Sequence, residues 1–160
     1  MSEAAAKASE LFRADIGKDE GTGEWFQVTQ DQIDRFADVT HDHQFIHVDP
    51  ERAKDTPFGT TIAHGFLTLS MLTHLASGAS SAPPDPGKYA GMLMGVNYGF
   101  NRVRFVSPVK VGSRIRARGV TANAELKGNT VEVTRNITIE IEGEDKPALA
   151  AEWVIRTVYG

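Results

Sequence analysis

The sequence predicts an α+β fold in which one long buried helix is wrapped by a curved antiparallel sheet. Residues 65 to about 78 are apolar on most sides of a helix, which is typical of a helix packed against a sheet. After the proline- and glycine-rich stretch SSAPPDPGK, the apolar residues alternate with a period of two, which is typical of half-buried antiparallel strands. A sheet with one apolar face needs a covering layer, and the helix supplies it.

The first half of the chain contains the signals of one strand and several helices. Residues 24–28 (EWFQV) are aromatic and follow the glycines of DEGTG, so we predict a strand there. Thr29 and Gln32 have the spacing of a capping box, and apolar residues then recur at helical intervals, which predicts a helix over about 30–40. Asp49, followed by proline, is a typical N-cap and predicts a short helix through ERAKD.

The second half of the chain predicts about four long strands. In residues 130–142 (TVEVTRNITIEIE), valine and isoleucine alternate with polar side chains, and Arg135 is the only interruption. Residues 96–106, 113–126 and 148–158 show a similar pattern, and the segments SPVKVG, KGN and EGEDKP separate the strands. The expected order is therefore one strand, then helices, then the four strands.

Length, charge and composition narrow the class of protein. The 160 residues predict a single domain (1–160) with an N-terminal extension (1–23) that is either a helix packed on the outside or a partly disordered tail. Cysteine is absent, so disulfides and thiolate zinc sites are excluded. A net charge of −4 argues against a nucleic-acid-binding protein. Without a signal peptide or an apolar run long enough to span a bilayer, we expect a soluble cytoplasmic protein that inserts in no membrane.

The stretch HDHQFIHVDP (41–50) places an aspartate and a histidine on either side of a turn between two helices. Asp42 and His47 could converge on one small volume, as general acid–base catalysis requires. Alternatively, Asp42 caps a turn and His47 satisfies buried backbone groups. A metal site formed by His41, His43 and His47 is a third possibility, but it needs helical geometry in this loop. Without such geometry, the first two histidines face solvent.

The stretch FGTTIAHGFLTLS leads into the predicted buried helix. Backbone N–H groups at a helix start lack intrahelical partners, and a glycine lets a ligand approach them closely. Gly65 could therefore polarise a carbonyl oxygen, as in an oxyanion hole, or it could simply allow the helix to pack closely on the sheet. Four polar residues along this helix either border a cavity or permit tight packing: Ser70, Thr73, His74 and Ser77.

These two motifs together resemble a known family. The segment FADVTHDHQFIHVDPERAKDTPFGTTIAHGFLTLSML is similar to the hydratase motif of the MaoC-like dehydratases, the (R)-specific enoyl-CoA hydratases, and DHQFIHVDPERA with IAHGFLTLS resembles their nodulation protein N-like branch. The similarity extends more loosely through NYGFNRVRFVSPVKVGSRIRARG. It implies a hot-dog fold, in which an antiparallel sheet wraps a long central helix.

The resemblance also implies roles for individual residues. Asp42 and His47 match the family's catalytic aspartate and histidine, and Gly65 matches the glycine whose N–H receives the thioester carbonyl. Three residues precede this glycine and are expected to belong to the same substrate-binding segment: Ile62, Ala63 and His64. The chain departs from the common family motif at Gln44 and Phe45, where Asn-Pro is usual. No metal or other cofactor is implied.

The implied activity is the reversible addition of water to trans-2-enoyl thioesters, which makes the chain a hydro-lyase. Its partner would be an acyl-CoA or acyl-carrier-protein thioester, and its assembly a homodimer with sheets joined edge to edge. A hot-dog thioesterase is an alternative, although such enzymes generally place a carboxylate on the central helix and GFLTLSMLTHLAS has none. A non-catalytic acyl-thioester-binding protein is the other alternative.

Several arginines and two polar residues could contact the rest of such a substrate. Arg114, Arg116 and Arg118 should share one face of a strand, with a similar pair, Arg102 and Arg104, on the strand before. They either form a solvated outer face or receive the phosphates of coenzyme A. Two residues that precede this pair could contact the pantetheine arm: Asn97 and Tyr98.

Overall fold

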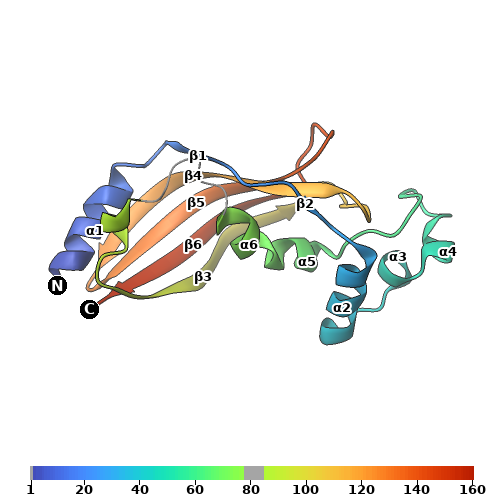
Figure 1. Ribbon diagram of the computed structural model, residues 1–160, viewed down its shortest axis with the longest axis horizontal. Helices are drawn as coiled ribbons and strands as arrows, with labels where there is room; N and C mark the ends of the chain where they lie inside the picture. Colours follow the sequence, from blue (N-terminus) through green and yellow to red (C-terminus); the bar gives the residue numbers. More distant parts are fainter. Residues whose placement is uncertain (1, 78–84) are drawn as a thin grey trace.

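The computed structural model describes residues 2–77 and 85–160, which form an antiparallel sheet with helices on one side and at both ends (Figure 1). The helices are α1 (Glu3–Arg13), α2 (Gln30–Thr40), α3 (Phe45–Val48), α4 (Pro50–Ala53), α5 (Gly65–Ser70), α6 (Leu72–Ser77) and the 3-10 helix η1 (Pro86–Lys88). The strands are β1 (Asp19–Thr22), β2 (Phe26–Gln27), β3 (Met92–Phe105), β4 (Arg114–Lys127), β5 (Thr130–Ile141) and β6 (Leu149–Tyr159). Their order is β1-β4-β5-β6-β3, with β2 also paired to β4.

The four long strands are confirmed, and the alternation of the sequence matches the burial of β4, β5 and β6, whereas β3 is exposed along most of its length. In β5, for example, Val131, Val133, Ile137, Ile139 and Ile141 are buried while most residues between them are only partly so. The first of the four, β3, begins four residues earlier than predicted. The predicted strand 24–28 is correct in place but shorter, since only Phe26–Gln27 pair with β4. Strand β1 was not predicted, because DEGT has no apolar alternation and forms a strand only by pairing with β4.

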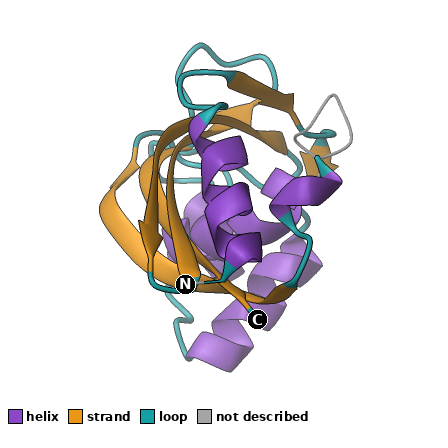
Figure 2. Cartoon of the chain, turned by 90° about the vertical axis from the view of Figure 1, so that its left-hand side faces the viewer, coloured by secondary structure: helices purple, strands orange, loops and turns teal. Residues whose placement is uncertain are grey.

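The main core lies between the sheet and the segment α5–α6. Leu67, Leu72 and Leu75 project from these helices onto apolar side chains of β4, β5 and β6. Seen end-on, the strands curve around the helices (Figure 2), which agrees with the predicted buried helix wrapped by a curved sheet.

The single helix predicted over 65–78 is wrong in one detail. Met71 separates α5 from α6, although hydrogen bonding continues through it, from Met71 N to Leu67 O and from Leu75 N to Met71 O. Residue 78 lies outside the described residues. The side of the helix that faces the sheet is buried, as predicted, and Phe66 on its outer side is 67% exposed. The four polar residues of the sequence prediction are exposed: Ser70, Thr73, His74 and Ser77. Two of them nevertheless contact the sheet, since the Thr73 hydroxyl lies 3.5 Å from the Asn97 amide of β3 and the His74 ring packs against Phe26 of β2.

The N-terminal extension begins with a helix that closes one end of the sheet. Ser2 caps α1, and Ala5, Ala8 and Phe12 pack on Val133 and its neighbours in a second apolar cluster. Of the two alternatives for this segment, the packed helix is therefore the one observed.

Helices α2, α3 and α4 gather at the end of the sheet opposite to α1 and to the two chain termini (Figure 1). The catalytic candidates lie at this end of the sheet: Asp42 in the turn before α3, His47 on α3 and Gly65 at the start of α5. Within residues 2–77 and 85–160, no helix is both long and apolar enough to cross a membrane.

Candidate active site

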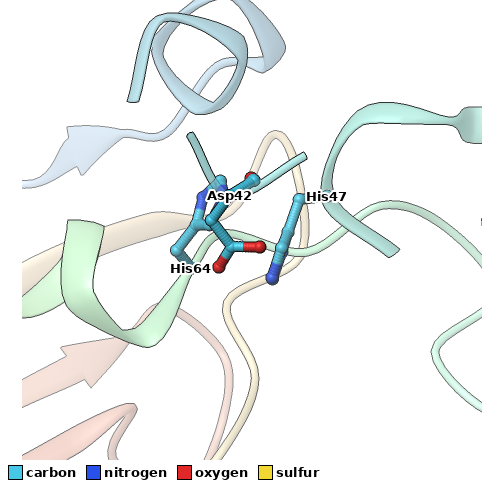
Figure 3. Close-up of side chains that lie close together, drawn as sticks. All are labelled: Asp42, His47 and His64. Carbon is cyan, nitrogen blue, oxygen red and sulfur yellow. The ribbon is translucent and has the colours of Figure 1, made fainter. Parts of the chain in front are cut away.

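The turn after α2 directs Asp42 toward α3. His41 ends α2 in the left-handed conformation, with φ 62°, which few residues other than glycine adopt. The Asp42 carboxylate accepts a long hydrogen bond of 3.4 Å from the Gln44 N–H and points toward the His47 ring (Figure 3). Asp42 itself is exposed. It therefore caps a turn, as one alternative predicted, and also faces the histidine, as the other did.

His47 lies on α3 and is buried, with 7% of its surface exposed. Its Nδ1 lies 2.7 Å from the carbonyl oxygen of Ile62. A carbonyl can only accept, so Nδ1 must carry the proton and the neutral ring leaves Nε2 as an unprotonated acceptor. His47 therefore forms the predicted hydrogen bond to a buried backbone group, and this bond leaves Nε2 free to accept a proton.

His64 joins these two residues from the segment before α5. Its ring stacks on that of His47, with centroids 3.8 Å apart and planes inclined by 26°. Its Nε2 lies 2.9 Å from the backbone carbonyl of Asp42 and donates to it, while its Nδ1 is buried without a partner. Sequence reasoning placed His64 only in the substrate-binding segment, because no local pattern predicts a contact across 22 residues.

The three side chains come close enough to raise the question of a metal. Ligand atoms of Asp42, His47 and His64 lie within 4.8 Å of one another. A metal ion binds each imidazole in the plane of its ring, about 2 Å from the nitrogen. Two stacked, nearly parallel rings do not share such a point, so this arrangement favours acid–base chemistry over metal binding. The metal set considered from the sequence is not assembled, since His41 and His43 are exposed and the latter pairs with Asp38.

A hydrogen-bonded clamp holds α3 against the segment 61–64. The Gln30 amide donates to the His47 carbonyl oxygen at 2.8 Å and accepts from the Thr61 hydroxyl at 2.5 Å. The Ile62 N–H donates to the Ile46 carbonyl oxygen at 3.0 Å. Sequence reasoning missed Gln30, which is an ordinary polar residue in the first turn of α2 and shows its role only through tertiary contacts.

The segment before α5 is itself anchored to the loop that precedes β4. Ile62 forms a β-bridge with Lys110, and the Ala63 N–H donates to the Val109 carbonyl oxygen at 2.7 Å. The N–H groups of Ile62 and Ala63 are therefore already used within the protein. In contrast, among the described residues the Gly65 N–H donates to no protein acceptor.

Gly65 also satisfies the packing alternative. A Cβ atom added there would lie 3.0–3.1 Å from ring carbons of Phe105, closer than normal contact allows. The absence of a side chain therefore lets α5 start against this ring. Both predicted roles of Gly65 are compatible with the structure.

The surroundings of His47 favour its neutral form. Burial, the largest influence, lowers the pKa of His47 below its ordinary value of 6.5. The hydrogen bond to the Ile62 carbonyl opposes this shift, the nearby His64 adds to it, and Asp42 opposes it. The net direction is downward, so the ring is an acceptor at neutral pH.

The outlying candidates lie apart from this cluster. Asn97 lies beside α6, with its amide 3.5 Å from the Thr73 hydroxyl, whereas Tyr98 is covered by the Arg156 guanidinium 3.3 Å from its ring centre. The three β4 arginines each form an ion pair with a carboxylate, as a solvated outer face would: Arg114 with Glu142, Arg116 with Glu140, and Arg118 with Asp19. The β3 pair, Arg102 and Arg104, forms no ion pair within the described residues.

Comparison with known proteins then decides the family. The model of the MaoC-like domain matches residues 12–142. The chain belongs to the MaoC-like family. Among MaoC-like relatives, nodulation protein N of Rhizobium leguminosarum bv. viciae is 53% identical over 141 residues, which cover 87% of this chain and 84% of that protein. The 3-hydroxyacyl-thioester dehydratase Z of Mycobacterium tuberculosis is 47% identical over 146 residues, covering 91% and 92%.

Solved structures of the family agree in fold. The (R)-hydratase from A. caviae superimposes with a TM-score of 0.64 at 23% identity, covering 88% of this chain and 94% of that one, a likeness that concerns the fold alone. The predicted family, its nodulation protein N-like branch and the hot-dog fold are thus confirmed. The predicted hydro-lyase class is confirmed by family membership together with the dehydratase relative.

Proposed function

We propose that the chain catalyses the reversible hydration of trans-2-enoyl thioesters to (R)-3-hydroxyacyl thioesters, carried by coenzyme A or by an acyl carrier protein. The observation that supports this most directly is the placement of the Asp42 carboxylate beside the unprotonated Nε2 of His47. The names of the relatives, which include a 3-hydroxyacyl-thioester dehydratase, point to the same substrate class.

Two acceptors side by side are suited to hold one water molecule. The water donates one O–H to the Asp42 carboxylate and the other to His47 Nε2, which leaves its oxygen lone pair free to attack C3. Asp42 accepts a proton as the C–O bond forms. The resting tautomer of His47 holds no proton on Nε2, so the proton gained by Asp42 passes to Nε2 and from there to C2. One hydrogen of the water ends on C2, the other stays in the hydroxyl, and both residues return to their starting state.

Gly65 supplies the third element of this mechanism. Attack at C3 moves electron density onto the thioester oxygen, and a free backbone N–H stabilises that charge. The Gly65 N–H suits this role because no protein acceptor within the described residues competes for it, whereas the N–H groups of Ile62 and Ala63 are occupied. Loss of such a donor typically costs roughly 10²- to 10³-fold in rate.

A spectroscopic experiment separates hydratase from the alternatives. The protein is mixed with short, medium and branched enoyl-CoA thioesters, and the absorbance of the conjugated enoyl thioester is followed beside an assay for free thiol. Loss of conjugation without thiol release supports the hydratase. Release of free thiol would mean a thioesterase, and no reaction with retained binding would mean an acyl-thioester-binding protein; either result contradicts the proposal.

We also propose that the protein is a homodimer joined through β3. This strand lies at one edge of the sheet, is 14 residues long and has exposed apolar side chains along its length, including Met94 and Val96. A long apolar edge strand invites pairing with another chain. A second copy of β3 would pair with this strand and extend the sheet. The exposed Phe66 lies near this edge, because it contacts Phe105 at the end of β3.

A further inference from the structure

We propose that His64 is a positioning residue that keeps the Asp42 carboxylate and the His47 ring in a fixed position relative to each other. Its effect on catalysis rests on the proposed hydratase function. His64 is 2% exposed and contacts both members of the pair through different parts of its ring. Each contact fixes a different degree of freedom.

The first contact ties down the backbone of Asp42. This residue lies in an exposed turn, where its one other hydrogen bond among the described residues joins its carboxylate to the Gln44 N–H of the same loop. Within the described residues, the 2.9 Å bond from His64 Nε2 to the Asp42 carbonyl is its only hydrogen bond to a distant part of the chain. Without this bond, the carboxylate would be carried by a loop free to drift from His47.

The second contact covers one face of the His47 ring. The stacked imidazole of His64 excludes water from that face, and the Ile62 carbonyl fixes the ring edge. His47 is thereby held as a neutral acceptor with a single orientation. Phe36 also packs on His64, with ring centres 5.0 Å apart, and adds to the contacts that hold this ring in place.

The buried Nδ1 of His64 indicates which property of the imidazole matters. A buried polar atom without a partner costs stability, and this nitrogen has none. A phenylalanine would fill the same space and stack on His47 without that cost. What the histidine adds at this position is the single N–H that it donates to Asp42.

Two substitutions separate these contacts. His64→Phe keeps the stacked ring and removes the donor, whereas His64→Asn removes the ring and opens the face of His47 to water. The exposed His43 receives the same two substitutions as controls. For each variant we would measure kcat, KM, the thermal unfolding midpoint and, by NMR of isotope-labelled histidine rings, the pKa of His47.

The proposal predicts a different signature for each variant. Displacement of a catalytic group by about 1 Å can cost roughly 10²-fold, so kcat should fall roughly 10- to 100-fold in both variants with KM little changed. The pKa of His47 should stay low in His64→Phe and rise toward its ordinary value in His64→Asn. Neither change should occur in the His43 variants. A kcat within twofold of wild type in folded His64→Phe, or an unchanged His47 pKa in His64→Asn, would overturn the proposal.

The wild-type protein provides a test that needs no folded variant and no activity. The ring of His64 should be the Nε2–H tautomer, with Nδ1 unprotonated, as its bond to the Asp42 carbonyl requires. Observation of the Nδ1–H tautomer would overturn the positioning role. If the wild type lacks hydratase activity while this tautomer and the His47 pKa behave as expected, the proposed function fails and the positioning geometry stands.

Discussion

At the level of single residues, two backbone carbonyls set the chemistry of the site. The Ile62 carbonyl forces the proton of His47 onto Nδ1, and the Asp42 carbonyl forces that of His64 onto Nε2. The free nitrogen of His47 is consequently a base at neutral pH. Its position beside a carboxylate suits the site to accept protons from water.

The lowered pKa of His47 predicts a pH-dependent stability. Above pH 6.5 the ring is neutral in the folded and the unfolded chain, so its contribution is fully present. As the pH falls below 6.5, the unfolded chain binds a proton more readily than the folded one, and the free energy of unfolding decreases. The decrease continues until the pH reaches the lower pKa of the folded state.

Denaturant unfolding between pH 8 and 5 checks this expectation. His47→Gln should show a shallower decline than the wild type in the interval below 6.5, because it lacks the buried imidazole whose pKa is lowered on folding. Equal slopes in wild type and His47→Gln would show that burial does not favour neutral His47.

The sequence indicates part of this site and hides the rest. Asp42 and His47 could be found because both lie in one short stretch of the sequence, directly after a predicted helix. Gln30 and the contacts of His64 could not, since they depend on how α2 and the segment before α5 dock on α3. The crowded His41 and His43 suggested a metal, but the left-handed turn leaves both on the surface.

At the level of secondary structure, the start of α5 combines a close packing contact with the proposed oxyanion donor. A Cβ atom at Gly65 would lie 3.0–3.1 Å from the Phe105 ring, so either the ring or the helix start would have to shift. Gly65→Ala should displace the helix start together with its N–H. We expect a loss of kcat of at least about tenfold, toward the 10²- to 10³-fold that removal of an oxyanion donor causes.

Rescue and control variants show whether this loss is steric. The double variant Gly65→Ala/Phe105→Leu removes the clashing ring and should recover much of the lost rate. Gly160→Ala is a matched control, because its added Cβ would lie in ordinary contact, 3.5 Å from Leu93. If Gly65→Ala alone has the kcat of the wild type, the helix start does not position an essential donor.

The strands and helices differ in how well the sequence predicts them. The long strands β4, β5 and β6 were predictable because one face is buried and the period of two appears in the residue pattern. Short elements such as β1 and α3 have too few residues for any period, and tertiary pairing decides them. The break at Met71 was unpredictable for a similar reason, since an apolar residue within a helical pattern gives no stop signal.

At the level of the whole molecule, the sheet has a protected side and an open edge. Helix α1 covers the far end of β4, β5 and β6, while β3 exposes several apolar side chains. The sequence shows that these side chains are apolar, but not that they are exposed, because their exposure depends on the place of β3 in the sheet. The position of β3 at the edge of the sheet follows from the strand order.

The proposed dimer predicts a specific response to charge. Val96 on β3 is 42% exposed. In an edge-to-edge dimer, the lysine of Val96→Lys would either lose its hydration or lie opposite the same lysine of the partner subunit, and both effects oppose pairing. Analytical ultracentrifugation should show a dimer for the wild type and a shift toward monomer for this variant. The same change in α2, Val39→Lys, at a residue that is 76% exposed, should leave the assembly unchanged. A monomeric wild type would refute the dimer.

The central claim is that Asp42 accepts a proton from water during hydration of an enoyl thioester, and the hydration rate of Asp42→Asn tests it most directly. Asparagine keeps the size of the side chain and removes the base, so with crotonyl-CoA as substrate the rate should fall by at least about 10²-fold while the unfolding midpoint changes little. Asp38→Asn, an exposed carboxylate in the last turns of α2, should hydrate the substrate like the wild type. An Asp42→Asn protein that hydrates crotonyl-CoA at the wild-type rate would contradict the account.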